Sequence, residues 1–115
     1  MKENQAQLYT EFLENSQTKN SREKLLFLAV ILQALLDASK PKTRNESDLT
    51  LNSRERATAW FFCSIGVTCD NFEYICDNAD INSSYVRTFA YKVLKSKEIN
   101  FVRKRINKLL DNSKN

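Results

Sequence analysis

Apolar residues recur along this chain at intervals of three and four, and polar runs separate the apolar segments. That spacing is typical of amphipathic α-helices that pack on a common core. One Gly and one Pro in 115 residues leave too few turn formers for a β-sandwich or barrel. We therefore expect an all-α fold in one domain that spans residues 1–115.

The pattern predicts five or six helices arranged around a central apolar helix. The expected segments are residues 4–16, 21–39, 53–65, a short helix capped by Asp70 or Asn71, 83–95 and 97–111. The run Leu25–Leu36 is apolar most of the way round, so its helix should be the central one. Twelve residues are too few to cross a bilayer, and no signal-peptide pattern opens the chain. We expect no membrane partner and a cytoplasmic location.

The string NSRE occurs twice, and each copy carries the Asn and Glu of a helix capping box. The copy at Asn20–Glu23 predicts the start of the central helix. The copy at Asn52–Glu55 predicts that a helix begins at residue 53, after a polar loop over 41–52. Gly66 is expected to end this helix as a left-handed C-terminal residue.

The next stretch, residues 72–89, fits the spacing of a helix-turn-helix. Such a motif needs a small residue where the second helix crosses the first and a turn residue that tolerates positive φ. It also needs an apolar residue after the turn and another five residues later. These positions are filled by Cys76, Asp80, Ile81 and Val86, in that order. An ordinary helical corner fits much of the same spacing. We expect residues 53–95 to form a helix-turn-helix-like unit of three helices.

The charge distribution favours the DNA-binding interpretation of this corner. Residues 1–82 carry nine Lys and Arg against twelve Asp and Glu, whereas residues 83–115 carry nine against two. The two parts therefore have net charges of −3 and +7. A basic end on a slightly acidic body indicates an anionic partner, nucleic acid first. A solvated basic face without a partner is the alternative.

Two expected helices, 83–95 and the basic C-terminal helix 97–111, supply outward side chains that hydrogen-bond base edges or phosphates. The predicted DNA-binding residues are Asn82, Ser83, Ser84, Arg87, Thr88, Tyr91, Lys92, Lys95, Arg103, Lys104 and Lys108. Arg87 is expected on the outer side, one turn into its helix, where it can reach a base or a phosphate. Arg103 and Lys104 are expected to be exposed phosphate contacts.

The chain offers little for catalysis. It has no His, no Gly-rich phosphate loop and no nucleophile beside a base, so we expect no enzyme and no cofactor. Cys63, Cys69 and Cys76 match no zinc spacing and lie among apolar residues. We expect them to be reduced, buried and free of metal. Gln33 and Asp37 lie four residues apart on one helix face and are interpreted as structural hydrogen-bonders.

Three segments resemble a group of small phage and prophage proteins. They are LAVILQALLDA (Leu28–Ala38), RATAWFFCS (Arg56–Ser64) and FEYICDNADINSSYVR (Phe72–Arg87). The resemblance covers about half of the chain and implies an all-helical fold and an origin in a phage or other mobile element. Asp80 stands where the group has Gly, so here an aspartate must adopt the turn conformation. No functional residue is carried over from the group.

The leading hypothesis is a small DNA-binding protein, a phage-type transcription regulator that works as a dimer or alongside host RNA polymerase. Helix 83–95 would lie in the major groove of duplex DNA, in the cytoplasm of a host cell. The alternative is a phage-encoded adaptor or inhibitor of the anti-defence type, which binds a host protein through the same basic face.

Overall fold

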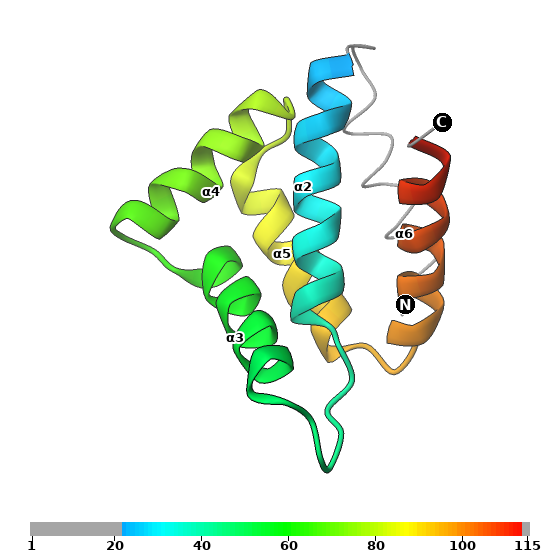
Figure 1. The fold of residues 1–115 in the computed structure, drawn as a ribbon. Coiled ribbons are helices and arrows are strands. Elements are labelled where there is room, and N and C mark those ends of the chain that lie inside the picture. Colours follow the sequence, from blue (N-terminus) through cyan, green and yellow to red (C-terminus); the bar gives the residue numbers. More distant parts are fainter. Residues whose placement is uncertain (1–21, 114–115) are drawn as a thin grey trace, which may run out of the picture.

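The chain folds into helices joined by short connections in the computed structural model, which describes residues 22–113. The helices are α2 (Arg22–Ala38), α3 (Asp48–Phe62), α4 (Val67–Asn78), α5 (Ser83–Lys95) and α6 (Ile99–Ser113) (Figure 1). No strand occurs between residues 22 and 113, and the expected all-α fold is confirmed. The helix expected over residues 4–16 and the Asn20 cap lie outside the described residues.

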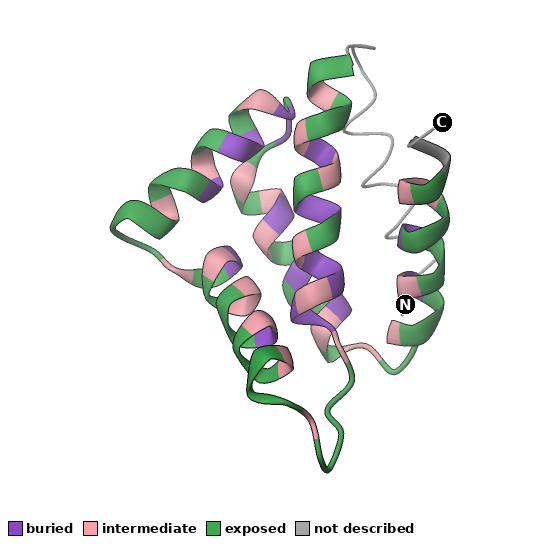
Figure 2. Cartoon of the chain, viewed as in Figure 1, coloured by how far each residue is buried: buried purple, intermediate pink, exposed green. Residues whose placement is uncertain are grey.

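α2 is the central helix, as its apolar run predicts. It lies between α3 and α4 on one side and α6 on the other, while α5 packs against α3, α4 and α6 (Figure 1). Its buried apolar residues are Leu28, Ile31, Leu32, Leu35, Leu36 and Ala38. Buried positions concentrate along α2 and α5, whereas α3 is exposed over much of its length (Figure 2). The start of the apolar run is less buried than its sequence suggests, because Leu25 and Leu26 are 47% and 68% exposed.

Aromatic rings join α3 to α4 in the core. Phe61 and Phe72 are fully buried, and the Trp60 ring packs edge-on against both, at centroid distances of 5.1 and 4.9 Å. The Trp60 indole Nε1–H donates a hydrogen bond to the side-chain oxygen of Asn71 at 2.7 Å. The core role expected for Trp60 is confirmed, and its polar atom has the partner that a half-buried indole needs.

The start of α3 corrects the sequence prediction. The helix begins at Asp48, so Asn52–Glu55 lies inside it and is not a capping box. The cap is Ser47, whose hydroxyl accepts a hydrogen bond from the Thr50 backbone N–H at 3.2 Å. Because this earlier cap satisfies the first turn, the polar loop expected over 41–52 is shorter than predicted.

The passage from α3 to α4 corrects a second prediction. α3 ends at Phe62, with Cys63 in an extended conformation, and the next helix begins at Val67. Gly66 therefore does not end α3. It precedes α4 with φ 92° and ψ −173°, and its carbonyl accepts a hydrogen bond from the Asp70 N–H at 3.0 Å. Asp70 and Asn71, expected as caps, lie inside α4.

The bounds of the last two helices lie close to those expected. α5 runs from Ser83 to Lys95, as predicted. α6 begins at Ile99, two residues later than expected, because the Ser96 hydroxyl accepts a hydrogen bond from the Glu98 N–H at 2.9 Å and holds the connection in a turn. Its inner face buries Val102 and Ile106 as the spacing predicts.

A buried ion pair fixes the connection between α2 and α3. Arg54 is only 7% exposed, and its two terminal nitrogens donate hydrogen bonds to both carboxylate oxygens of Glu46. These hydrogen bonds lower the pKa of the Glu46 carboxyl below its ordinary value of 4.5, while desolvation acts in the opposite direction. The pair ties the last residues of the connection to the second turn of α3.

Replacing Glu46 with Gln should therefore destabilise the fold in a pH-dependent way. Because the folded-state pKa of Glu46 is depressed, its stabilisation is fully present above the unfolded-state pKa and is lost as the pH falls through the folded-state pKa. The difference in unfolding free energy between wild type and Glu46→Gln should be largest near neutral pH and shrink below about pH 4.5. Urea unfolding across this range measures it.

Asp111→Asn is the control, since Asp111 is exposed on the last helix. Its difference in unfolding free energy from wild type should not shrink in the same way as the pH falls. If the difference in unfolding free energy between wild type and Glu46→Gln stays constant from neutral to acidic pH, the stabilising pair between Glu46 and Arg54 is contradicted.

Candidate nucleic-acid interface

The corner between α4 and α5 closes through a left-handed residue. Asp80 has φ 57°, so the expected positive φ is confirmed at this position. The Asp80 N–H donates to the Asp77 carbonyl at 3.1 Å, and the Ile81 N–H donates to the Cys76 carbonyl at 3.1 Å. This pair of bonds is the Schellman arrangement, which satisfies the last carbonyls of a helix and turns the chain sharply.

The apolar positions of the predicted motif are buried at this corner. Cys76 and Val86 are fully buried and Ile81 is 7% exposed. Cys76 on α4 and Val86 on α5 belong to one core cluster of two helices that pack against each other, and Ile81 anchors the turn in that core. The burial that the spacing predicts at these positions is therefore confirmed, and an ordinary helical corner would show the same burial.

Asn82 is the first predicted DNA-binding residue whose role changes. It is the N-cap of α5, and its side-chain oxygen accepts a hydrogen bond from the Tyr85 N–H at 3.0 Å. Ser83, in the first turn, is half-buried. Asn82 is exposed, as predicted, but its side-chain oxygen is engaged as the cap of α5, and Ser83 faces outward less than predicted.

Five predicted residues do form one exposed face of α5. This outer stripe of α5 consists of Ser84, Thr88, Tyr91, Lys92 and Lys95. The Thr88 hydroxyl donates to the Ser84 carbonyl at 3.0 Å, and the Lys95 ammonium lies 5.7 Å from the centre of the Tyr91 ring. The outer stripe of α5 thus begins with hydroxyls and ends with two cations.

Arg87 corrects the prediction most sharply, because it points into the structure. Its Nε–H donates to the Phe61 carbonyl at 3.0 Å, and Nη2 contacts the Cys63 carbonyl at 3.4 Å. Its guanidinium also pairs with Glu73 at 3.3 Å and lies 4.6 Å from the centre of the Phe72 ring. Arg87 therefore satisfies the C-terminus of α3 and joins it to α4 and α5.

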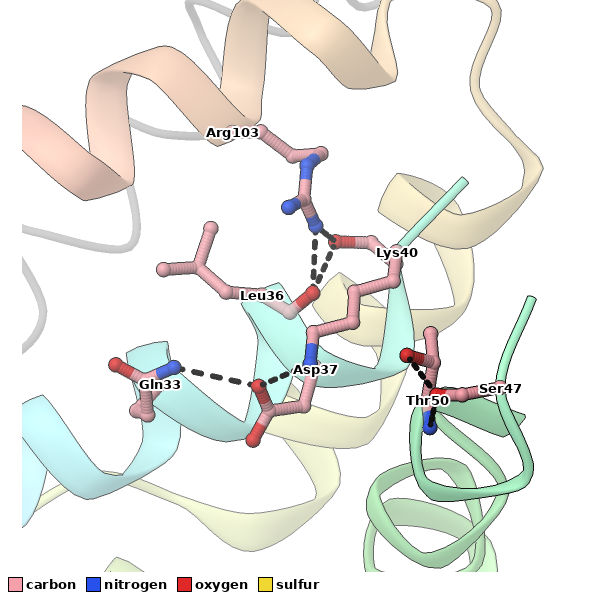
Figure 3. A network of polar contacts seen from close by, with 8 residues as sticks. Gln33, Leu36, Asp37, Lys40, Ser47, Thr50 and Arg103 are labelled. Atoms are coloured by element: carbon pink, nitrogen blue, oxygen red, sulfur yellow. Dashed lines mark hydrogen bonds and ion pairs between the residues drawn. The ribbon is translucent and has the colours of Figure 1, made fainter. Parts of the chain in front are cut away.

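Arg103 was expected to be an exposed phosphate contact and is half-buried instead. Figure 3 shows it reaching from α6 to the last turn of α2, where Nη1 donates to the Leu36 carbonyl and, at 2.7 Å, to the Ser39 hydroxyl. The positive charge lies at the negative end of the helix dipole there.

Figure 3 also shows Gln33 donating a hydrogen bond to Asp37, at 3.3 Å, which confirms their structural role.

The remaining predicted cations lie on α6. Lys104 and Lys108 are exposed, on the side opposite to the buried Val102 and Ile106. α6 packs against α5, so the two helices that carry these cations are neighbours in the fold. The structure therefore keeps the lysines of the predicted interface at the surface and withdraws its two arginines.

The carboxylates near the corner are partly neutralised. Asp80 pairs with Lys24 at 3.0 Å and Glu73 with Arg87 at 3.3 Å. Asp70 and Asp77 stay exposed on α4. The two paired carboxylates belong to internal contacts, so the negative charge of α4 counts for less than its sequence suggests.

Sequence reasoning missed a groove between α3 and the C-terminal half of α5. It has a volume of about 870 Å³. Its lining residues include Phe62 of α3, Tyr91 and Lys95 of α5, and Lys42 of the α2–α3 connection. A second groove of about 690 Å³ lies between α2 and α3, where Trp60 and Arg56 are on its wall. The only sequence signal for the first groove was an aromatic residue, Phe62, that the helical spacing leaves partly outside the core.

The three thiols are unpaired in the structure. Cys76 is buried, and burial raises its pKa to about 12, so this thiol is inert near neutral pH. Cys63 and Cys69 are only half-buried, less than expected; one donates to the Ile65 carbonyl and the other accepts from Arg87. Among the described residues, no group of three His, Cys, Asp or Glu side chains could hold a metal ion.

Comparison with known proteins adds no assignment to this geometry. No protein-family model, no curated protein and no solved structure matches the chain. Within residues 22–113, no helix combines the length and the apolar character needed to cross a membrane.

Arg87→Ala should destabilise the protein, contrary to the expectation that a surface substitution leaves folding intact. It removes the partner of two carbonyls at the end of α3 and of the Glu73 carboxylate, with an expected cost of about 1–3 kcal/mol. Urea unfolding measures the effect. Lys104→Ala, at an exposed position, is the matched control and should change stability by less than about 0.5 kcal/mol. Equal stability of the two variants would contradict a structural role for Arg87.

Asp80 gives a second stability test at the turn. Asp80→Ala and Asp80→Asn both lose the ion pair with Lys24, but only Asn tolerates the left-handed conformation. The Ala variant should therefore be less stable than the Asn variant by about 1 kcal/mol in urea unfolding. If the two variants unfold at the same urea concentration, the turn has relaxed and positive φ is not required.

Proposed function

We propose that this protein binds duplex DNA through α5 and acts as a small regulator of transcription. The observation that carries the proposal is the corner at Asp80, which closes with positive φ and leaves the outer stripe of α5 exposed on the second helix. In the helix-turn-helix mode, the first turns of the second helix meet base edges and its flanks meet phosphates. Ser84 and Thr88 lie in those first turns.

The chemistry of the exposed residues predicts the character of the binding. Arg, Asn and Gln make the bidentate contacts that discriminate bases most strongly, but the Arg87 guanidinium is engaged inside the fold and the Asn82 side-chain oxygen caps α5. Base recognition would rest on the hydroxyls of Ser84 and Thr88, which bond to several bases. Lys92 and Lys95 would contact phosphates, so affinity should depend strongly on salt and weakly on sequence.

The neighbouring helix extends the proposed contact. Lys104 and Lys108 on α6 add cations that would lie on the DNA backbone beyond the ends of α5. A dimer would double the contact, and host RNA polymerase is the other proposed partner. The resemblance to small phage and prophage proteins implies an origin in a mobile element, so we propose that the regulator acts in the cytoplasm of a host cell.

An adaptor that binds a host protein is the second candidate, supported by a separate feature. Ile65, in the α3–α4 connection, and Val67, the first residue of α4, flank Gly66 and are 81% and 85% exposed. Two large apolar side chains held at the tip of a tight connection are typical of protein-contact residues. An adaptor would retain a host protein in a pull-down and leave duplex DNA unbound.

A gel-shift series with duplex DNA tests the leading proposal. Wild type should shift unrelated duplexes at about 50 mM salt, and log K should fall linearly with log salt. Lys92→Ala should weaken binding to all sequences alike and reduce the salt slope by about 0.9, the value of one phosphate contact. Arg56→Ala is the control, since it removes an exposed cation from the α2–α3 groove.

For Arg56→Ala we expect log K to fall with log salt at a slope close to that of wild type. If the intact protein does not shift duplex DNA even at about 50 mM salt, where phosphate contacts are strongest, the DNA-binding proposal is abandoned. If Lys92→Ala and Arg56→Ala lose the same affinity for DNA, the protein is attracted to DNA by its net charge and α5 holds no defined interface.

A further inference from the structure

The groove between α3 and α5 combines aromatic rings with cations. Phe62 is 39% exposed and Tyr91 is 57% exposed, and both line the same open space of about 870 Å³. Leu51 and Leu94 add apolar surface between them. Large planar side chains left this open in one groove offer surfaces on which other flat rings can stack.

Positive charge also lines this groove. Lys42 and Lys95 line the groove from opposite elements, the α2–α3 connection and the end of α5. The Lys95 ammonium lies 5.7 Å from the centre of the Tyr91 ring. Arg54 also lines the groove, but its charge is neutralised by the two hydrogen-bonded oxygens of Glu46. Glu55 is the acidic residue among the lining side chains, so the cations are in excess.

We propose that this groove binds unpaired bases of a single nucleic-acid strand. Bases would stack on Tyr91 and Phe62, and the phosphates on either side would lie near Lys95 and Lys42. Exposed aromatic rings together with cations in an open groove are the features by which proteins hold single strands without sequence preference. The proposal rests on the proposed nucleic-acid function and specifies a second class of substrate for it.

Tyr91 and Lys95 connect the two proposed sites. Both belong to the outer stripe of α5 and both also line the groove. A strand that leaves a duplex held on α5 would therefore enter the groove directly. An acidic peptide would meet the same cations, but it has no general need for two open aromatic rings; we take the single strand as the occupant.

The probe is a fluorescent oligo(dT) of about 12 nucleotides, a length within the range of known single-strand sites. It is titrated with the 115-residue protein in an anisotropy assay. Wild type should bind it at about 50 mM salt and more weakly as salt rises. Phe62→Leu and Tyr91→Leu keep apolar side chains but remove the stacking rings. Each should weaken binding by about fivefold or more.

Two matched variants separate stacking from other effects. Tyr91→Phe keeps the ring and should bind oligo(dT) like wild type. Tyr74→Leu removes a tyrosine on α4 that has the same 57% exposure but lies outside the groove, and it should leave binding unchanged. Thermal unfolding confirms that each variant is folded at the assay temperature.

The outcomes distinguish this proposal from the duplex proposal. If duplex DNA binds but oligo(dT) does not, the groove proposal is wrong and the duplex proposal stands. If oligo(dT) binds and both Leu variants bind like wild type, the strand lies elsewhere and the groove proposal is also wrong. If neither nucleic acid binds, both proposals fail. If instead a Glu- and Leu-rich peptide binds and Tyr91→Leu abolishes that binding, the groove is a protein site.

Discussion

The guanidinium of Arg87 is the contact on which the arrangement of α3, α4 and α5 depends. It satisfies carbonyls of Phe61 and Cys63 at the end of α3, pairs with Glu73 on α4, and originates from α5. The end of a helix leaves carbonyls without intrahelical partners, and burying them without donors would cost free energy. One side chain that supplies both the donors and the charge therefore holds three helices at a fixed geometry.

Two more arginines act in the same way elsewhere in the fold. Arg103 on α6 donates to Leu36 and Ser39 at the end of α2, and Arg54 binds Glu46 at the end of the connection before α3. Arginine suits these positions because its planar fork serves several acceptors at once, which lysine cannot do. These three arginines stabilise the fold, while the exposed cations that a ligand would meet on α5 and α6 are lysines and Arg105.

That division changes how the basic C-terminal part should be interpreted. A count of charges gives residues 83–115 a strong excess of positive charge, but Arg87 and Arg103 are already committed to internal acceptors. The cations left for a partner are mainly lysines, which attract phosphates without reading bases. Together with the aromatic groove between α3 and α5, this favours binding through backbone charge and stacking over recognition of a defined base sequence.

The sequence by itself determined the features that rest on local interactions. The bounds of α5, the positive φ of Asp80 and the burial of Cys76 and Val86 could be predicted, because caps, turns and apolar spacing act within a few residues. Even locally, competing caps misled the prediction: Ser47 began α3 before Asn52 could, and Gly66 served α4 where an end to α3 was expected.

Only the tertiary structure decided the roles of Arg87 and Arg103 and the existence of the groove. Arg87 donates a hydrogen bond to a carbonyl 26 residues away in the sequence, and Arg103 donates one to a carbonyl 67 residues away. No periodicity along the chain encodes such pairings, since the acceptors are backbone carbonyls that every residue has. Phe62, Tyr91 and Lys42 likewise come from separate elements. The spacing of each helix predicts which side faces the core, but only packing decides which exposed sides face one another across a groove.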